Sequence, residues 1–300
     1  MAGFILEIID IFPRFLSVWD KIKKTPLPER PEAWEDLIMK DYPELLEKLI
    51  DDYRSNQVDW KKVSKEKVFP FLEDRFLDMY EAHDNLMEIL PGLIARFERE
   101  TDRAIHGYLV IYVGIGCGAG WVTEYRGKPA ILLGLENVAE CCWHKPEALL
   151  GLLAHELGHL YQKQVREEKI GQDHFSSFTQ LFEEGFAHWF EMKLRNKEQT
   201  HIAVGINPSG WDKWCEENKS FLAKRFLNKT SRKEDTSEFF GHWQGIYGWK
   251  SCGFYLGYLY VKSLFEKGYS IEEVASFEKA EEGLKDFLEE IMLEGKGGEK

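Results

Sequence analysis

Residues 146–164 read PEALLGLLAHELGHLYQKQ, and this stretch decides how the rest of the chain is interpreted. Pro146 suits the first turn of a helix, where a backbone N–H would have no intrahelical partner in any case. The leucines that follow recur at helical spacing and form one apolar stripe: Leu149, Leu150, Leu153, Leu157 and Leu160. The pattern predicts a helix over residues 146–165 that is buried along one side.

The same stretch contains His155, Glu156 and His159 in the order HExxH. Two histidines at positions i and i+4 lie one helical turn apart, so both imidazoles can reach one zinc ion. Glu156 points about 100° around the helix from His155. It therefore stands beside the metal, where it can take a proton from the attacking water. The segment predicts one Zn²⁺ per chain, against the alternative of a helix that holds these residues by chance.

A hydrolytic zinc site usually has three protein ligands and one open position. The metzincin pattern is excluded, because Val165 and Gln162 stand where that class has histidine and glycine. Glu184 is the better candidate for the third ligand. It lies in a segment, residues 176–195, that has its own apolar stripe at helical spacing: Leu181, Phe182, Phe186, Phe190 and Leu194.

HELGH followed by EEGFA resembles the gluzincin group of metallopeptidases, and this resemblance implies that Glu184 is the third zinc ligand. Glu183 stands where related proteins carry asparagine, so the choice between the two carboxylates is open. His188 matches a position that supports a ligand histidine in that group, and it is equally consistent with an exposed residue of an amphipathic helix. His174, in the preceding loop, is a rival ligand.

A later segment, residues 249–264, reads WKSCGFYLGYLYVKSL. It resembles the late GYxxGY-like helix of a family of predicted zinc-dependent proteases that also has HExxH and EGxA motifs. In gluzincins a tyrosine or histidine from this region donates a hydrogen bond to the oxyanion. The resemblance makes Tyr255 and Tyr258 the candidates, with Tyr247 as an alternative. Without a catalytic role, Gly253 and Gly257 would indicate a helix that packs closely through glycine.

Between residues 107 and 135 the period changes, and YLVIYVGIG, GWVT and AILLGLE predict two or three strands. Gly114, Gly116, Gly118 and Gly120 lack the order of a phosphate-binding loop and indicate bends or close backbone contacts. The resemblance to gluzincins implies that an edge strand pairs with an extended peptide substrate. Residues 119–123 or 130–134 could form that strand.

These patterns together predict an α+β fold that is mainly α, with a small mixed sheet next to the HExxH helix and helices on both sides. The resemblance implies a zincin-like core. We expect a helical N-terminal region of no assigned role over residues 1–105 and a catalytic domain over 106–300. Within that domain we place the sheet at 107–135, the HExxH helix at 146–165, the third-ligand helix at 176–195 and helical structure to the C-terminus.

The charge and the cysteine content indicate which partners and which cellular compartment to expect. With 39 Lys and Arg against 52 Asp and Glu, the formal charge of −13 argues against nucleic acid and anionic membranes as partners. The apolar stretch 4–16 contains Glu7, Asp10 and Pro13, which a secretory signal would not. The five cysteines include no CxxC pair. We therefore expect a cytoplasmic protein, whose acidic surround favours basic or neutral peptides.

The function predicted is that of a zinc metallopeptidase, a hydrolase that acts on a peptide or protein substrate. One alternative is a zincin-fold module that keeps the metal, is catalytically idle and binds a partner. A second alternative is a structural zinc site with four ligands, in which His188 is the fourth.

Overall fold

The computed structural model describes residues 6–55, 57–169 and 176–294. The chain is mainly helical and has one small mixed sheet of four strands, which confirms the α+β, mainly α class expected from the sequence. Contacts within the chain group it into two compact units, Met1–Glu156 and Leu157–Lys300.

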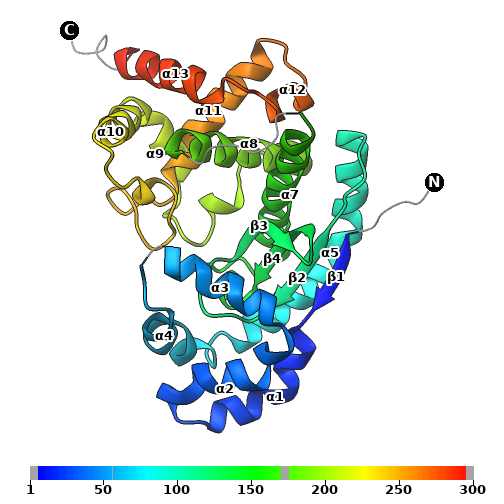
Figure 1. Cartoon of the computed structure of the whole chain (residues 1–300). Coiled ribbons are helices and arrows are strands. Elements are labelled where there is room, and N and C mark those ends of the chain that lie inside the picture. The colour runs from blue at the N-terminus through cyan, green and yellow to red at the C-terminus, as the bar shows by residue number, and fades with distance from the viewer. Residues whose placement is uncertain (1–5, 56, 170–175, 295–300) are drawn as a thin grey trace. The chain divides into compact units, whose positions relative to one another are not determined.

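The sheet belongs to the first unit and has the strand order β1-β2-β4-β3 (Figure 1). The strands are β1 (Glu7–Asp10), β2 (Tyr108–Tyr112), β3 (Gly120–Tyr125) and β4 (Lys128–Gly134). β2 pairs in parallel with both β1 and β4, and β3 is antiparallel to β4. β3 is therefore an edge strand, whereas β4 is an inner strand with a buried second half.

β1 was not expected from the sequence. Its four residues, EIID, carry a charge at each end and have no clear alternation of apolar and polar side chains. They become a strand because Glu7 pairs with Tyr108 in register, about a hundred positions along the chain. Such long-range pairing leaves no local pattern.

The described part of the first unit also contains six α-helices and the start of a seventh. The helix α1 follows the carboxyl end of β1, and the long helix α5 passes along the sheet (Figure 1). Their bounds are α1 (Phe12–Lys24), α2 (Arg30–Leu37), α3 (Pro43–Ser55), α4 (Trp60–Val63), α5 (Phe76–Thr101), α6 (Leu135–Glu140) and the first part of α7 (Pro146–Lys169). The division into residues 1–105 and 106–300 stays a prediction, and within the first unit β1 pairs with β2 of the sheet.

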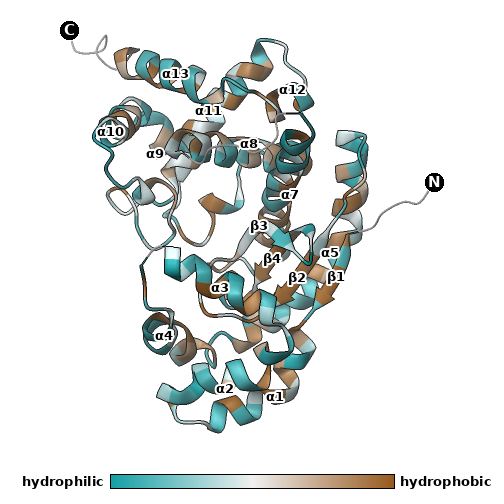
Figure 2. Ribbon diagram, viewed as in Figure 1, coloured by the Kyte–Doolittle hydropathy of each residue, from teal (hydrophilic) through white to brown (hydrophobic). Residues whose placement is uncertain are grey.

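The second unit is helical. It holds the rest of α7 together with α8 (Ser177–Arg195), α9 (Trp211–Glu217), α10 (Lys219–Ser231), α11 (Cys252–Glu266), α12 (Ile271–Ala275) and α13 (Ala280–Glu294). All five residues of the apolar stripe expected on α8 are buried, from Leu181 to Leu194. Figure 2 shows hydrophobic residues, in brown, on the strands of the first unit and on the helices of the second.

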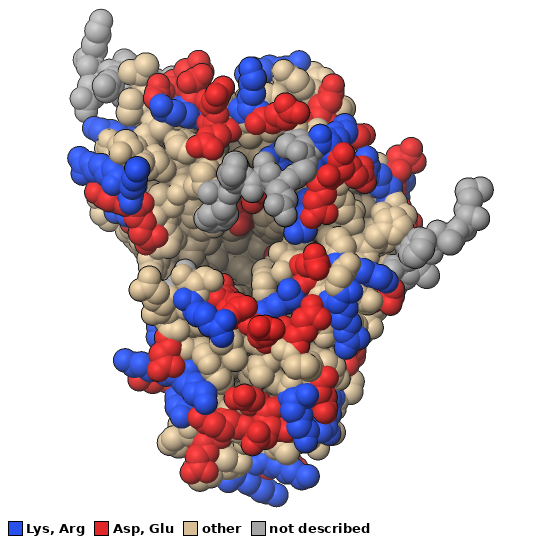
Figure 3. Space-filling view, in the orientation of Figure 1, with Lys and Arg blue, Asp and Glu red and all other residues tan. Residues whose placement is uncertain are grey.

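Charged side chains of both signs are interspersed on the face drawn in Figure 3, and no single sign dominates it. Within the described part of the chain, no helix combines the length and the apolar run that crossing a bilayer requires.

Candidate metal centre

Helix α7 carries the HExxH residues at its middle and runs without a break through the boundary between the two units. His155 and His159 therefore keep the one-turn spacing of a continuous helix. Leu153, Leu157 and Leu160 bury the apolar side of this helix. His155 is only 3% exposed, whereas His159 is half-buried.

Glu184 of α8 approaches His159 directly. One of its carboxylate oxygens, Oε2, lies 3.4 Å from Nε2 of His159. Ligand atoms of His155, His159 and Glu184 all lie within 4.8 Å of one another. The structure thus brings together the three residues that the sequence proposed as metal ligands.

Two glycines next to these ligands set the spacing of the helices. A Cβ on Gly158 would lie 2.9 Å from the Cα of Ala187 on α8, so only glycine allows α7 and α8 to come this close. A Cβ on Gly185 would lie 2.1 Å from the carbonyl carbon of Gly257 on α11. Because Gly158 precedes His159 and Gly185 follows Glu184, these close contacts keep the two candidate ligands side by side.

Stacked aromatic rings support the same helix contacts. Tyr161 of α7 stacks on Phe186 and Phe190 of α8, with ring centroids 6.2 and 5.7 Å apart. Trp189 of α8 stacks on Phe265 of α11, with ring centroids 3.8 Å apart. Each such pair adds about 1 kcal/mol beyond the area it buries.

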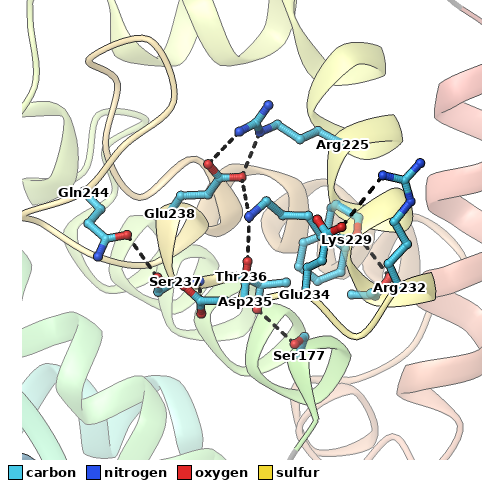
Figure 4. A network of polar contacts seen from close by, with 12 residues as sticks. Ser177, Arg225, Lys229, Arg232, Glu234, Asp235, Thr236, Ser237, Glu238 and Gln244 are labelled. Carbon is cyan, nitrogen blue, oxygen red and sulfur yellow. Dashed lines mark hydrogen bonds and ion pairs between the residues drawn. The ribbon is translucent and has the colours of Figure 1, made fainter. Parts of the chain in front are cut away.

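The first turn of α8 is anchored by a polar network, shown in Figure 4. The Ser177 and Thr236 hydroxyls are 2.9 Å apart, and Thr236 belongs to the segment that follows α10. That segment is held in turn by Arg225, which donates two hydrogen bonds of 2.8 Å to the Glu238 carboxylate. The Arg225 hydrogen bonds lower the pKa of Glu238, so this ion pair is kept at neutral pH.

Glu156 lies against the edge strand. A Cβ added to Gly120 would be 2.8 Å from Oε1 of Glu156, so the Glu156 side chain rests on the start of β3 and would have to shift if Gly120 carried a side chain. Glu156 is 4% exposed. The contact between Gly120 and Glu156 joins residues far apart in the sequence, so no local pattern predicts it.

The structure describes two of the three positions that the sequence left open, the Glu183–Glu184 pair and His188. The metal group includes Glu184 and not Glu183, which is half-buried on the same helix. His188 is 1% exposed and packs against the rings of Trp211 and Tyr258, so its interpretation as a surface residue is wrong. His188 belongs to none of the ligand groups found among the described residues. His174 lies outside the described residues.

The three candidate tyrosines have different surroundings. Tyr258 is half-buried, with its ring 5.6 Å from that of His188, one turn beyond Glu184 on α8. The Tyr255 hydroxyl donates a 2.7 Å hydrogen bond to Glu216. Burial raises the pKa of both phenols, which keeps them protonated at neutral pH. Tyr247 is 79% exposed and stacks on Phe221.

Two other ligand groups occur among the described residues, and neither needs a metal. In the first, which includes His155, the Glu191 carboxylate accepts hydrogen bonds from Arg195 and from His201, each at 2.7 Å. This buried trio was missed by the sequence analysis, although Glu191 and Arg195 show the i, i+4 spacing of a helical ion pair.

The other group consists of Asp78, Glu81 and His144. Here the Lys145 ammonium makes two 2.8 Å hydrogen bonds to Glu81, and it already supplies the positive charge.

The donor set of His155, His159 and Glu184 fits zinc. Two imidazole nitrogens and one carboxylate oxygen form the ligand set of several catalytic zinc sites. Glu156 follows His155 on the same turn of α7. It is the acidic side chain there that does not belong to the donor set.

Comparisons with protein-family models, with curated proteins and with solved structures find no match to this chain.

Proposed function

We propose that this chain is a zinc-dependent metallopeptidase with a zincin-like core. The observation that carries the proposal is the meeting of His155, His159 and Glu184 within 4.8 Å of one another. Beside them, the Glu156 side chain projects from the same turn of α7 and contacts Gly120 of the edge strand. A metal-ligand set, a base and an open strand edge are the three parts that a zinc peptidase requires.

In the proposed site His155, His159 and Glu184 hold one Zn²⁺. Zinc, when bound, supplies a Lewis acid that lowers the pKa of water and stabilises negative charge on a carbonyl oxygen. Glu156 takes the proton of the attacking water and later gives it to the leaving amine. Its burial against β3 restricts the rotamers that the Glu156 side chain can adopt, which favours one orientation of the carboxylate.

β3 is the proposed binding strand for the substrate. It lies at the edge of the sheet and is antiparallel to β4, and residues Gly120 to Thr123 are half-buried. Its free edge can pair with an extended peptide through backbone hydrogen bonds, which gives affinity with little sequence preference. Of the two segments that the sequence left open, only 119–123 borders an edge, because β4 is paired on both sides.

Tyr258 is the proposed hydrogen-bond donor to the developing oxyanion, with Tyr255 as the alternative. Tyr258 follows Gly257, which packs on α8 beside Glu184, and it contacts His188. The Tyr255 hydroxyl is engaged with Glu216. Tyr258→Phe should therefore lower kcat about 100-fold, as the loss of one oxyanion donor does, and Tyr255→Phe should lower it less.

The test combines metal content with an unbiased peptide-library digest of three purified proteins: the wild type, Glu156→Gln and Glu167→Gln. Glu167 is the matched control, because it lies on the same helix and its side chain is 54% exposed. We expect bound zinc in all three and cleavage by the wild type and Glu167→Gln alone. If Glu156→Gln cleaves as fast as the wild type, the mechanism is wrong. Zinc without any cleavage by the wild type would instead support a catalytically idle metal-binding module.

A further inference from the structure

The loop of residues 113–119 connects β2 to the edge strand β3 and is held from two sides. It reads VGIGCGA, and its apolar residues Val113, Ile115 and Ala119 are buried. A buried loop must find partners for its backbone groups within the protein, because an unbonded buried amide or carbonyl is costly.

The carbonyl oxygens of this loop are bound by the N-terminal helices. The indole N–H of Trp34, on α2, donates to the oxygen of Val113 at 2.8 Å. The hydroxyl of Tyr53, on α3, donates to the oxygen of Ile115 at 2.7 Å. Both side chains are buried.

The N–H groups of the loop are bound by α6. Glu136 Oε1 accepts from Gly116 at 3.2 Å, and Asn137 Oδ1 accepts from Gly118 at 3.1 Å. Asn137 also donates to Glu140, which pairs with Arg75, the residue before α5. These contacts hold the Asn137 amide in place.

Glycines are required where the loop meets these partners. A Cβ on Gly114 would lie 2.8 Å from Glu136 Oε1. Gly116 and Gly118 have φ angles of 93° and 136°, which other residues rarely adopt. The positive φ angles at Gly116 and Gly118 therefore favour glycine on this path, and a side chain at Gly114 would require Tyr112 or Glu136 to shift.

The path ends at Glu156. The oxygen of Ala119 accepts from the N–H of Gly134 at 3.0 Å, and the next residue, Gly120, contacts the Glu156 side chain. A shift of the loop would move the start of β3 and release the support of this carboxylate.

Four side chains, which we call the loop brace, make these contacts: Trp34, Tyr53, Glu136 and Asn137. We propose that the loop brace positions β3, and with it Glu156, for catalysis and for substrate pairing. The N-terminal helices thereby acquire a role in the active site without contacting the reacting atoms. The inference rests on the proposed peptidase function, since positioning is defined by that reaction.

Tyr53→Phe tests the proposal by deleting one oxygen atom and keeping the buried ring. Its matched control is Tyr80→Phe, whose side chain lies on α5 and is 47% exposed. Hydrogen exchange over residues 113–125 of the full-length protein measures the hold on β3 without any need for activity. KM and kcat for a peptide taken from the digest measure the positioning.

Loss of a hydrogen bond worth about 1 kcal/mol corresponds to about a fivefold change. We expect Tyr53→Phe to speed exchange over residues 113–125 by about that factor and to raise KM several-fold, with zinc content unchanged. Asn137→Ala should act in the same direction if Tyr53→Phe folds poorly. Tyr80→Phe should change none of these quantities.

Unchanged exchange in both brace variants would overturn the brace itself. Faster exchange with unchanged KM and kcat would overturn the positioning role. If the wild type cleaves no peptide, the positioning role falls with the proposed function, and the exchange rates then still report whether the brace holds β3.

Discussion

Gly185 of α8 and Gly257 of α11 meet backbone to backbone. A Cβ on Gly257 would lie 1.9 Å from the carbonyl oxygen of Leu181, and one on Gly185 would lie 2.1 Å from the carbonyl carbon of Gly257. Glu184 precedes Gly185 and Tyr258 follows Gly257. The crossing of the two helices therefore also fixes the positions of these two proposed site residues. The close approach is therefore both a packing feature and a constraint on the proposed metal centre.

Substitution of Gly257 by alanine should disrupt this crossing. The added methyl group has backbone on its near side, so the helices must separate, and we expect a loss of at least about 2 kcal/mol in the free energy of unfolding. Zinc affinity should fall as well. Chemical denaturation and metal titration measure the two effects.

Gly92→Ala is the control for that variant. It lies inside α5, and nothing stands within 4 Å of the added Cβ. Alanine in an open helix interior should stabilise the protein by roughly 0.5–1 kcal/mol. Equal effects of the two substitutions would show that the α8–α11 crossing tolerates a side chain.

The two neighbouring carboxylates of α8 should differ in their effect on the metal. Glu184→Ala removes the residue whose oxygen lies 3.4 Å from His159, so zinc affinity should fall by at least about 100-fold. Glu183→Ala should leave the affinity within a few-fold of the wild type. Zinc titration against a competing chelator makes the comparison, and a larger loss in Glu183→Ala would reverse the assignment.

The buried Glu136 makes stability depend on pH. Burial raises its pKa from 4.5 to about 7, and the N–H groups of Gly114 and Gly116 oppose that shift. The folded state therefore holds the proton more tightly than the unfolded chain. Its contribution to stability is full below pH 4.5 and is lost as the pH rises through 7. The titratable groups around it are Asp52, Tyr53, Tyr112, Cys117 and Glu140.

Glu136→Gln removes this titration. The difference in unfolding free energy between variant and wild type should shift in favour of the variant by on the order of 3 kcal/mol from pH 4.5 to pH 8.5. Denaturation at the two pH values measures the shift. A difference that does not change with pH would contradict the role of Glu136 as the titrating group.

His83 should show the same direction of pH dependence as Glu136, because its pKa is also raised in the folded state. Its Nε2 lies 2.8 Å from Oδ2 of Asp10, at the end of β1, and this hydrogen bond raises the pKa of His83 above 6.5. The stabilisation is full below pH 6.5 and is lost as the pH rises through the raised value. His83→Gln should cost about 1 kcal/mol at pH 6 and less at pH 9. Equal losses at both pH values would show that the contact is not charge-dependent.

The sequence alone was sufficient for features that lie within one helix. The spacing of His155 and His159 follows from the helical repeat, and so does the buried stripe of α8 from Leu181 to Leu194. The helical fold with a small mixed sheet could be predicted for the same reason, because the periods of helix and strand are local properties of the chain.

Contacts between distant segments were decided by the tertiary structure. The pairing of β1 with β2 joins residues about a hundred positions apart. The order of the strands made β3 the edge, and packing against Trp211 and Tyr258 buried His188. Local periodicity carries no information about such pairs, because their energy depends on side chains and backbone groups that only folding brings together.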